Sequence, residues 1–424
     1  MLKFRRVGAS KVLFAVLAFV TAAFVLLAFS KETFDAKALL FMALTWLLIM
    51  VQHMLLCFIL PNGDRLTGVL VGFLMGIGLV MQYRLDADTA LKQLIFSCVG
   101  LAAMCGVIML MKKPIVLIYL RIPAALLSLG ILAALLFVGK ESGGAVNWIS
   151  IGGILFQPSE FVKIAMIIVL AGAMSERTRL NELIWPTAFA VAVCVLLVLQ
   201  RDLGAAMLMA MVYMTMFYAA TCRLGTTLLG VAACCGGAVL SYNLFDHVKR
   251  RVAVWLDPWA TYSTSGYQIA QGLMAIASGG LFGMGLGLGS PKLIPAYRTD
   301  YIFAVICEEF GIIFGIGVIA VYLIIVVRGC MAALSVKSRF VSLCAFGASA
   351  LLAVQTFIII GGVIKLIPLT GITMAFVSYG GSSLVAFMML HGIIQSASDM
   401  GASELELALE SDVDEDEESE GEEA

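Results

Sequence analysis

The fold is decided by apolar stretches such as FVSLCAFGASALLAVQTFIIIGGV, residues 340–363, which lies between Arg339 and Lys365. As an α-helix, this uncharged stretch is long enough to cross the roughly 30 Å hydrocarbon layer of a membrane. Its residues do not alternate between apolar and polar, as they would in the roughly ten-residue strands of a membrane β-barrel. The stretch therefore predicts a transmembrane helix that is apolar on every face.

Composition extends this prediction to the whole chain of 424 residues. Hydrophobic residues make up 62% of the chain and charged residues 13%, and the mean hydropathy is +1.03. Soluble proteins average about 45–50% apolar and about 25% charged residues. Too little polar surface is left to face water, so the composition excludes a soluble globular protein.

Apolar runs recur along the chain and predict an all-α polytopic membrane protein with about twelve transmembrane helices. The predicted spans lie near residues 11–30, 37–60, 66–83, 91–111, 121–138, 160–175, 183–199, 203–220, 224–243, 301–328, 340–363 and 377–397. Lys3, Arg5 and Arg6 precede the first span, and further bases recur in alternate short loops. Bases in short loops mark the cytoplasmic side, so both termini are predicted to be cytoplasmic.

The net charge of −1 hides an asymmetry between the body and the C-terminal tail. From Glu404 onward the chain holds 12 of its 28 acidic residues and no Lys or Arg. The other 16 acidic residues face 27 bases, so the rest of the chain carries about +11. Dense charge of one sign opposes packing, so residues 401–424 are predicted to form a disordered cytoplasmic tail.

Two connections are long enough to have a function of their own. Residues 139–159 and 244–300 fall on the predicted outer side, whereas most other loops are short. Long loops within a compact bundle are usually functional. The longer one contains Lys249, Arg250 and Arg251, and long loops escape the positive-inside rule, so these bases need another reason. A basic outer surface suits an anionic lipid or an anionic substrate.

Several charged side chains lie within or at the edges of the apolar runs, all on the predicted outer half. They are Glu160, Lys163, Arg201, Asp202, Asp300, Glu308, Glu309 and Lys365. Each costs a few kcal/mol at membrane depth unless it is paired or hydrated, so such residues favour a functional interpretation. Together they predict a polar cleft that opens outward, in which Asp300 could act as a general base.

Simpler interpretations stay open for the same residues. Glu160 and Lys163 lie three apart on one helix face and can form a structural ion pair. Glu308 and Glu309 can anchor hydrogen bonds, and the bases at 249–251 can meet lipid headgroups. Polar groups at membrane depth serve both enzymes and transporters, so the residues alone do not separate these classes.

Cysteine and histidine usage gives no sign of a metal centre or a disulfide framework. The ten cysteines lie almost entirely in apolar runs, no two of them form a Cys-x-x-Cys pair, and the chain has three histidines. Structural zinc sites and disulfide scaffolds have regular cysteine spacing, which is missing here. No metal ligand set is therefore predicted.

Five groups of polar segments resemble the motifs of the SEDS family (shape, elongation, division and sporulation), which includes RodA, FtsW and SpoVE. In family order they are Asn147-Trp148-Ile149 with Gln157-Pro158-Ser159-Glu160-Phe161-Val162-Lys163; Gln200-Arg201-Asp202-Leu203-Gly204; Asp257-Pro258-Trp259 with Gly266-Tyr267-Gln268 and Gln271; Arg298-Thr299-Asp300-Tyr301-Ile302-Phe303 with Glu308-Glu309-Phe310-Gly311; and Pro368-Leu369-Thr370-Gly371 with Ser378-Tyr379-Gly380-Gly381-Ser382-Ser383. The resemblance implies a ten-span core in residues 63–400, with 244–300 as its large outer loop, preceded by two additional spans in residues 1–62.

This resemblance implies a peptidoglycan glycosyltransferase of the bacterial cytoplasmic membrane. Such an enzyme polymerises lipid II at the outer face of the membrane: the 4-hydroxyl of an acceptor GlcNAc attacks the anomeric carbon of the donor, and undecaprenyl pyrophosphate leaves. The implied partners are lipid II, a class B penicillin-binding protein and other elongation or division machinery, and no nucleic acid is expected. A divalent cation, Mg or Mn, is also implied, with unknown ligands.

The resemblance assigns roles to individual residues. Asp300 matches the catalytic aspartate of the family and is expected to act as general base. Basic residues expected to meet the pyrophosphate are Lys163, Arg250, Arg251 and Lys365, because guanidinium and ammonium groups bind phosphate oxygens. Further expected substrate-binding residues are Glu160, Asp202, Thr299, Ser378, Tyr379, Gly380 and Gly381, the last four in a turn expected to bring the backbone close to the cleft.

Three residues depart from the family pattern. Arg201 and Ala375 replace prolines, and Arg298 replaces a histidine before Thr299. Arg298 is expected either to lower the pKa of Asp300 by its charge or to contact phosphate. A lipid II flippase is the alternative function, but charge confined to the outer half favours the polymerase, and the retained Asp300 argues against an inactive scaffold.

Overall fold

The structure is a computed structural model that describes residues 8–30, 34–142, 145–151, 154–176 and 180–422. Lys3, Arg5 and Arg6, on which the predicted orientation depends, lie outside the described residues, as do Lys31 and the bases at 177 and 179. The orientation of the chain in the membrane therefore stays a prediction.

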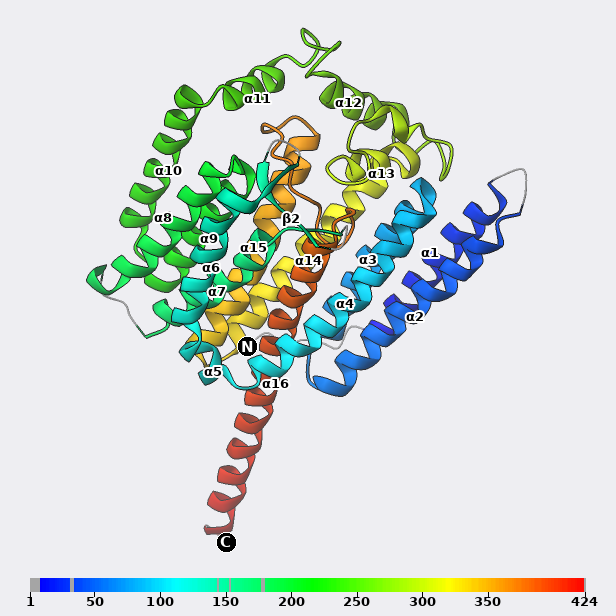
Figure 1. The fold of residues 1–424 in the computed structure, drawn as a ribbon. Helices are drawn as coiled ribbons and strands as arrows, with labels where there is room; N and C mark the ends of the chain where they lie inside the picture. The colour runs from blue at the N-terminus through cyan, green and yellow to red at the C-terminus, as the bar shows by residue number, and fades with distance from the viewer. Residues whose placement is uncertain (1–7, 31–33, 143–144, 152–153, 177–179, 423–424) are drawn as a thin grey trace.

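The described chain is an all-α bundle with a small sheet on one side (Figure 1). Its helices are α1 (Ala9–Phe29), α2 (Ala36–Ile59), α3 (Arg65–Leu85), α4 (Ala87–Met111), α5 (Pro114–Tyr119), α6 (Arg121–Val138), α7 (Ser159–Met174), α8 (Ile184–Leu199), α9 (Leu203–Thr221), α10 (Leu224–Leu244), α11 (Asp246–Leu256), α12 (Tyr267–Gly279), α13 (Ile302–Phe310), α14 (Ile312–Ser335), α15 (Arg339–Val363) and α16 (Gly381–Glu422). Two 3₁₀ turns, Leu180–Leu183 and Pro291–Leu293, complete the helical elements of the described residues.

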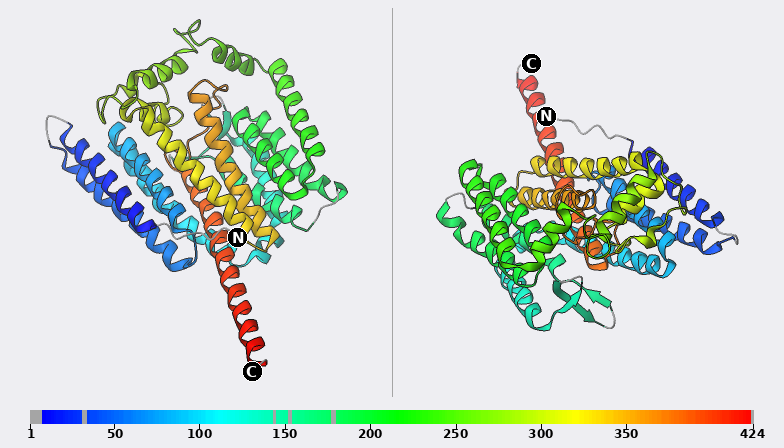
Figure 2. Two further views of the ribbon diagram at one scale, coloured as in Figure 1. Left: turned by 180° about the vertical axis from the view of Figure 1, so that it is seen from behind. Right: turned by 90° about the horizontal axis from the view of Figure 1, so that it is seen from above.

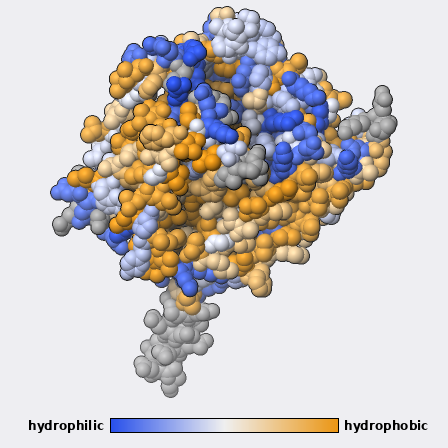
Figure 3. Space-filling view, viewed as in Figure 1, coloured by the Kyte–Doolittle hydropathy of each residue, from blue (hydrophilic) through white to orange (hydrophobic). Residues whose placement is uncertain are grey.

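Ten helices within the described residues are long and apolar enough to cross a membrane, which confirms the predicted class of multi-pass membrane protein. The predicted spans 160–175 and 377–397 correspond to α7 and to the first part of α16, which pack inside the same bundle. The surface agrees with this assignment, since an apolar band covers the middle of the molecule between two more hydrophilic ends (Figure 3).

The helices differ in how deeply they are buried, and this places the core. In the most apolar window of each helix, 89% of α3 and 78% of α15 is buried, against 6% of α10. Thus α3 and α15 stand at the centre, whereas α10 stands at one edge and the α1–α2 hairpin at the other (Figures 1 and 2). The hairpin packs on α3 and forms an apolar cluster of its own with that helix.

The two predicted outer connections contain regular structure. Residues 139–159 form an antiparallel sheet of β1 (Lys140–Ser142), β2 (Ala145–Ile151) and β3 (Ile154–Phe156), in that order. The sheet projects from the side of the bundle (Figure 2), and the amide of Val146 donates to the carbonyl of Gln200 at 2.9 Å. Residues 244–300 contain α11 and α12, which arch over one end of the bundle (Figure 1).

The predicted span 301–328 is wrong as a single helix, because it divides at Gly311 into α13 and α14. Gly311 has φ +90°, and a Cβ placed on it would lie 2.3 Å from the carbonyl oxygen of Leu281. The amide of Ile312 donates instead to the carbonyl of Gly280 at 2.9 Å. A left-handed backbone in such close contact admits only glycine, so the helix must break there.

The segment 401–424, for which disorder was predicted, continues helix α16 as far as Glu422 and is otherwise outside the described residues, so its disorder stays a prediction. The first part of this segment is tied to neighbouring turns. The amide of Lys337 donates to Glu404 at 2.8 Å, and the side chain of Asn62 donates to Glu406 at 3.0 Å. These neutral donors satisfy two of the carboxylates of the acidic segment, and α16 leaves the bundle opposite α11 and α12 (Figure 1).

Candidate functional site

The candidate site is organised around the segment between α15 and α16, residues 364–380, called here the 364–380 loop. It has no regular helix or strand and is held by side chains from distant elements. The indole of Trp255 donates to the carbonyl of Lys365 at 3.1 Å, and Arg251 donates to the carbonyl of Thr370 at 3.3 Å. The loop is therefore fastened to α11, the first helix of the outer arch.

Asp300 lies in the turn before α13 and faces this loop. A Cβ placed on Gly371 would lie 3.7 Å from Oδ2 of Asp300. The hydroxyl of Ser378 donates to the carbonyl of Thr299 at 2.7 Å, and the amide of Tyr379 donates to the carbonyl of Arg298 at 2.9 Å. Of the predicted site residues, Thr299, Asp300, Ser378 and Tyr379 are thus brought together.

The environment of Asp300 suits a general base. Burial raises the pKa of this carboxyl to about 6, partly opposed by a hydrogen bond from Thr299 and by the charge of Arg251. A base is most effective when its pKa lies near the working pH, because it is then mostly ionised yet still binds a proton. Asp300 is only partly exposed, so it is shielded without being closed off.

The first of the two roles expected of Arg298, lowering the pKa of Asp300, is wrong, whereas a contact with phosphate stays a prediction. Its guanidinium pairs with Asp86 at 3.2 Å, donates to the hydroxyl of Thr89 at 3.0 Å and lies over the ring of Tyr297. The cation that lowers the pKa of Asp300 is Arg251 from α11 rather than Arg298. The sequence pointed to the neighbour in the chain, whereas the neighbour in space comes from an element about fifty residues away.

Glu160 and Lys163 form the predicted ion pair, with Nζ of Lys163 2.7 Å from Oε1 of Glu160. Both side chains are buried, with exposed fractions of 2% for Lys163 and 7% for Glu160. Lys163 also donates to Gln355 at 3.0 Å, and Gln355 donates in turn to the carbonyl of Thr373 at 2.8 Å. The pair therefore supports the 364–380 loop from inside the bundle.

Asp202 is fixed at the start of α9. Its Oδ1 accepts from the amide of Ala205 at 3.0 Å, and its Oδ2 accepts from the side chain of Asn147 at 2.5 Å. Burial raises the pKa of Asp202, whereas the Ala205 amide and the charge of Lys163 oppose that rise. Asp202 thus joins the sheet, α9 and the Glu160–Lys163 pair.

The remaining predicted cations, Arg250, Arg251 and Lys365, differ in their exposure to solvent and in their contact with the 364–380 loop. Arg250 is exposed on α11, whereas Arg251, one residue on, is half-buried and turned to the loop. Lys365 has φ 62° and donates to the carbonyl of Leu256 at 3.2 Å, at the end of the same helix. Arg251 and Lys365 therefore line one side of the loop, at its contact with α11.

Gly380 and Gly381 need their small size for packing. A Cβ on Gly381 would lie 2.6 Å from the ring of Phe96 in α4, and one on Gly380 would lie 3.3 Å from Thr373. The predicted reason, close approach of the backbone to a substrate, is replaced at Gly381 by close approach of α16 to α4.

Sequence reasoning missed three glutamines that hold the site. Gln355 connects Lys163 to Thr373, Gln93 donates to the carbonyl of Ser378 at 3.1 Å, and Gln82 donates to the carbonyl of Arg298 at 3.1 Å. Each is a neutral polar residue in a largely apolar helix. The cost of burying a polar group in a membrane was the available signal, but it was applied to charged residues alone.

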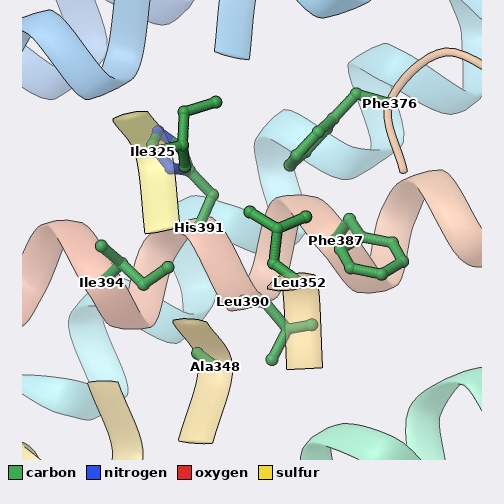
Figure 4. Close-up of a pocket in the computed structure, with 8 residues that line it drawn as sticks. All are labelled: Ile325, Ala348, Leu352, Phe376, Phe387, Leu390, His391 and Ile394. Atoms are coloured by element: carbon green, nitrogen blue, oxygen red, sulfur yellow. The ribbon is translucent and has the colours of Figure 1, made fainter. Parts of the chain in front are cut away.

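Two cavities lie away from Asp300. One beneath Phe376 has a volume of about 10 Å³ and is lined by apolar side chains and His391 (Figure 4), so it has room for about one water. The other, of about 510 Å³, lies between α8, α9 and α10 and is bordered by Tyr213, Met214 and Phe217. Its mostly apolar lining suits a hydrocarbon chain.

The described residues contain no group of three His, Cys, Asp or Glu side chains that could hold a metal ion. The carboxylates nearest the 364–380 loop, Asp300 and Asp202, are instead accompanied by Arg251, Lys163 and hydrogen-bond donors. Divalent cations favour several converging oxygen ligands. The side chains of the described residues therefore offer no ligand set for the divalent cation that the family resemblance implied, and that cation stays a prediction.

Fold and site together define a multi-pass membrane protein with a shielded carboxylate near α11, a helix that carries three consecutive bases. Residues 64–402 match the family model of FtsW, RodA and SpoVE, described as cell cycle proteins, and the chain belongs to this family. It is 35% identical over 368 residues to the peptidoglycan glycosyltransferase RodA of Mycobacterium tuberculosis (strain H37Rv), covering 80% of this chain and 78% of the relative. Stage V sporulation protein E of Bacillus subtilis (strain 168) is 36% identical over 270 residues, covering 62% and 73%.

A solved structure resembles the chain in three dimensions. It comes from work titled "Structural coordination of polymerization and crosslinking by a peptidoglycan synthase complex", with a TM-score of 0.70 and 26% identity. The similarity covers 80% of this chain and 98% of that chain. Nearly the whole of the solved relative is therefore represented here, and this chain has further elements beyond it.

Proposed function

We propose that this chain is a peptidoglycan glycosyltransferase that polymerises lipid II at the outer face of the bacterial cytoplasmic membrane. The observation that carries the proposal is Asp300: a shielded carboxyl with a pKa of about 6, next to Gly371 and within the field of Arg251. Family membership and the curated names of the relatives support the same activity.

In the proposed step, the carboxylate of Asp300 takes the proton of the acceptor's GlcNAc 4-hydroxyl. The hydroxyl oxygen attacks the anomeric carbon of the donor, the bond from that carbon to the pyrophosphate oxygen breaks, and undecaprenyl pyrophosphate leaves with the electron pair. A sugar hydroxyl is a weak nucleophile, so a positioned base contributes about 10²–10⁴-fold in rate. Attack opposite the leaving group inverts the anomeric centre and gives a β-1,4 link from an α-linked donor.

The leaving pyrophosphate needs positive charge, and the outer arch offers it. Arg251 and Lys365 lie beside the 364–380 loop, and Arg250 is exposed on the same helix. Lys163 is committed to Glu160 and Gln355, so we assign it to holding the loop. The apolar groove between α8, α9 and α10 supports a lipid-linked substrate, because it can accept part of a polyprenyl chain.

A class B penicillin-binding protein is the proposed partner, since the structural relative belongs to a peptidoglycan synthase complex. Lipid II and other elongation or division machinery complete the proposed partners. A divalent cation enters the proposal only as an ion bound to the pyrophosphate, because the described side chains offer no ligand set for a metal ion. No step of the reaction is assigned to the cation.

The test is lipid II polymerisation by the purified chain with its partner, comparing wild type with Asp300→Asn and separating the glycan products on a gel. We expect long strands from the wild type and none from the variant, because an amide cannot take up the hydroxyl proton. Binding of the partner, measured in parallel, shows that the variant is folded.

Normal polymerisation by Asp300→Asn would remove Asp300 from the role of general base. If wild type makes no strands although the partner binds, the polymerase proposal fails, and lipid II flipping in liposomes becomes the assay of choice.

A further inference from the structure

We propose that the α1–α2 hairpin, which precedes the family core, positions the segment that carries Asp300, and that it acts through Tyr83 of α3. The family model begins at residue 64, after the hairpin. The catalytic part of this inference rests on the proposed function, whereas the mechanical part is independent of it.

Three residues at the C-terminal end of α3, Gln82, Arg84 and Asp86, form hydrogen bonds and ion pairs with the chain on both sides of Asp300. These three residues are called here the α3 grip. Gln82 donates to the carbonyl of Arg298, and Asp86 pairs with the side chain of Arg298 at 3.2 Å. Arg84 donates to the carbonyls of Gly287 and Gly289 at 2.9 and 3.1 Å and pairs with Glu309 at 3.1 Å. The grip therefore fixes the chain two residues before Asp300 and nine residues after it.

Tyr83 lies in the middle of this grip and points the other way, into the hairpin. Its ring packs against Phe24 of α1, with centroids 5.7 Å apart, and against Phe41 of α2, with centroids 4.8 Å apart. All three side chains are buried, and they belong to the apolar cluster that the hairpin forms with α3. The residues of α3 that hold the Asp300 segment, Gln82 and Arg84, are therefore the direct neighbours of Tyr83, which contacts the hairpin.

The hairpin also touches the other support of the segment, the break between α13 and α14. Phe19 of α1 stacks on Phe314 at 5.5 Å and lies 6.0 Å from Phe310, so it contacts both sides of Gly311. At the outer end of α1, a Cβ placed on Gly287 would lie 3.6 Å from Cβ of Ser30. One hairpin therefore contacts both structures between which Asp300 is held.

Loosening these contacts should move Asp300 relative to the 364–380 loop without removing any group that binds the substrate. A misplacement of about 1 Å at a reacting group can cost about a hundredfold in rate. Arg251 and Lys365 are held by α11, which takes no part in these contacts. We therefore expect kcat to fall by about tenfold or more while KM changes little.

The experiment uses the full chain with Phe24→Leu and Phe41→Leu, singly and together, which keep apolar volume but remove the rings. Phe14→Leu is the matched control, because Phe14 lies on α1 with 75% of its surface exposed. Amide hydrogen exchange of residues 284–310 is measured by mass spectrometry, and lipid II polymerisation by steady-state kinetics. Tyr83→Leu should behave as the double variant does. Tyr83→Phe keeps the ring and loses only the hydrogen bond between the hydroxyl and Asp35, so its exchange and kcat should lie between those of Tyr83→Leu and the wild type.

We expect faster exchange across 284–310 and a lower kcat in the ring-removed variants, and neither in Phe14→Leu. Unchanged exchange in the double variant would overturn the mechanical coupling, whatever the activity. Faster exchange with an unchanged kcat would overturn the positioning of Asp300. An inactive wild type would remove the proposed function and with it the catalytic part, whereas the exchange data would still decide the coupling.

Discussion

Asp300 differs from Glu160 and Glu309 in its partners, because those two carboxylates form ion pairs. Glu160 is paired with Lys163 at 2.7 Å, and Glu309 is paired with Arg84 at 3.1 Å. Asp300 meets Thr299 and the charge of Arg251, which do not offset the effect of its burial on the pKa. At the scale of single residues, a carboxyl with a pKa of about 6 can take up a proton near neutral pH and still be ionised at pH 7.

The first prediction concerns pH. Asp300 acts as a base only when ionised, and burial raises its pKa to about 6, so polymerisation should fall as the pH drops through about 6. Well below that value the rate should fall about tenfold per pH unit, in proportion to the ionised fraction. Arg251→Gln should move this acidic limb to higher pH, because the charge of Arg251 lowers the pKa.

The measurement is the pH profile of kcat for wild type and Arg251→Gln. The matched control is Lys292→Gln, since Lys292 is an exposed base on the same outer segment. A shift of the same size in both variants would mean that general surface charge sets the limb, and would contradict a specific effect of Arg251 on Asp300.

The second prediction concerns the buried pair Glu160–Lys163. Lys163→Met leaves Glu160 buried and unpaired, which should lower the free energy of unfolding by about 3–5 kcal/mol. The double variant Glu160→Gln with Lys163→Met should regain most of this stability. Its activity should stay low, because the link from Lys163 through Gln355 to the 364–380 loop is still missing.

Thermal unfolding in detergent and lipid II polymerisation, measured on the single and double variants, test this pair. Full recovery of activity in the double variant would show that the pair is a structural ion pair and nothing more. That was the simpler interpretation of these two residues in the sequence.

At the scale of elements, the break between α13 and α14 decides where the Asp300 segment lies. The loop of residues 280–290 is hydrogen-bonded to both sides of the break: the amide of Met284 donates to the carbonyl of Glu308, and Ile313 donates to Leu281. A continuous helix would have no free carbonyls and amides for these bonds. The glycine-rich loop and the broken helix therefore depend on each other.

The third prediction follows from this dependence. Gly311→Ala should destabilise the protein by at least about 1–3 kcal/mol, because Ala is strained at φ +90° and its Cβ would lie 2.3 Å from the carbonyl oxygen of Leu281. Gly317→Ala in α14 is the control, since its Cβ would meet nothing within 4 Å. Apparent melting temperatures should separate the two variants, and equal values would contradict the assigned role of Gly311.

At the scale of the whole molecule, α16 connects the site to the opposite end of the bundle. In its first turn Ser383 accepts a hydrogen bond from Thr373 of the 364–380 loop, and its far part meets the turns before α3 and α15. Asp399 accepts from the amide of Asn62 at 2.8 Å, and Glu404 accepts from the amide of Lys337. The acidic segment is therefore partly a structural element before it becomes a free helix.

The fourth prediction separates these two parts by truncation. A chain that ends at residue 408 keeps the contacts of Asp399, Glu404 and Glu406, so its melting temperature and polymerisation should match the full chain. A chain that ends at residue 398 loses three hydrogen bonds to carboxylates and should unfold at lower temperature, at about 1.5–3 kcal/mol per bond to a charged group at most. Equal stability of both truncations would contradict the structural role.

The sequence by itself determined the helical membrane class, the places of most spans and the residues from which the site is built. These depend on the length and composition of contiguous segments, and a run of about twenty apolar residues has the same meaning whatever lies around it. The Glu160–Lys163 pair was also predictable, because two residues three positions apart on a helix share one face and lie within reach of each other.

Only the tertiary structure decided what each polar group meets. Arg298 pairs with Asp86 rather than with Asp300, Gly381 is small because of Phe96, and the helix breaks at Gly311 because Leu281 lies beside it. The first turns past residue 401 are tied to the bundle because Asn62 and Lys337 donate hydrogen bonds to Glu406 and Glu404. Each outcome depends on a residue far away in the chain, and the distance between two such residues is set by how the helices pack, which no local pattern contains.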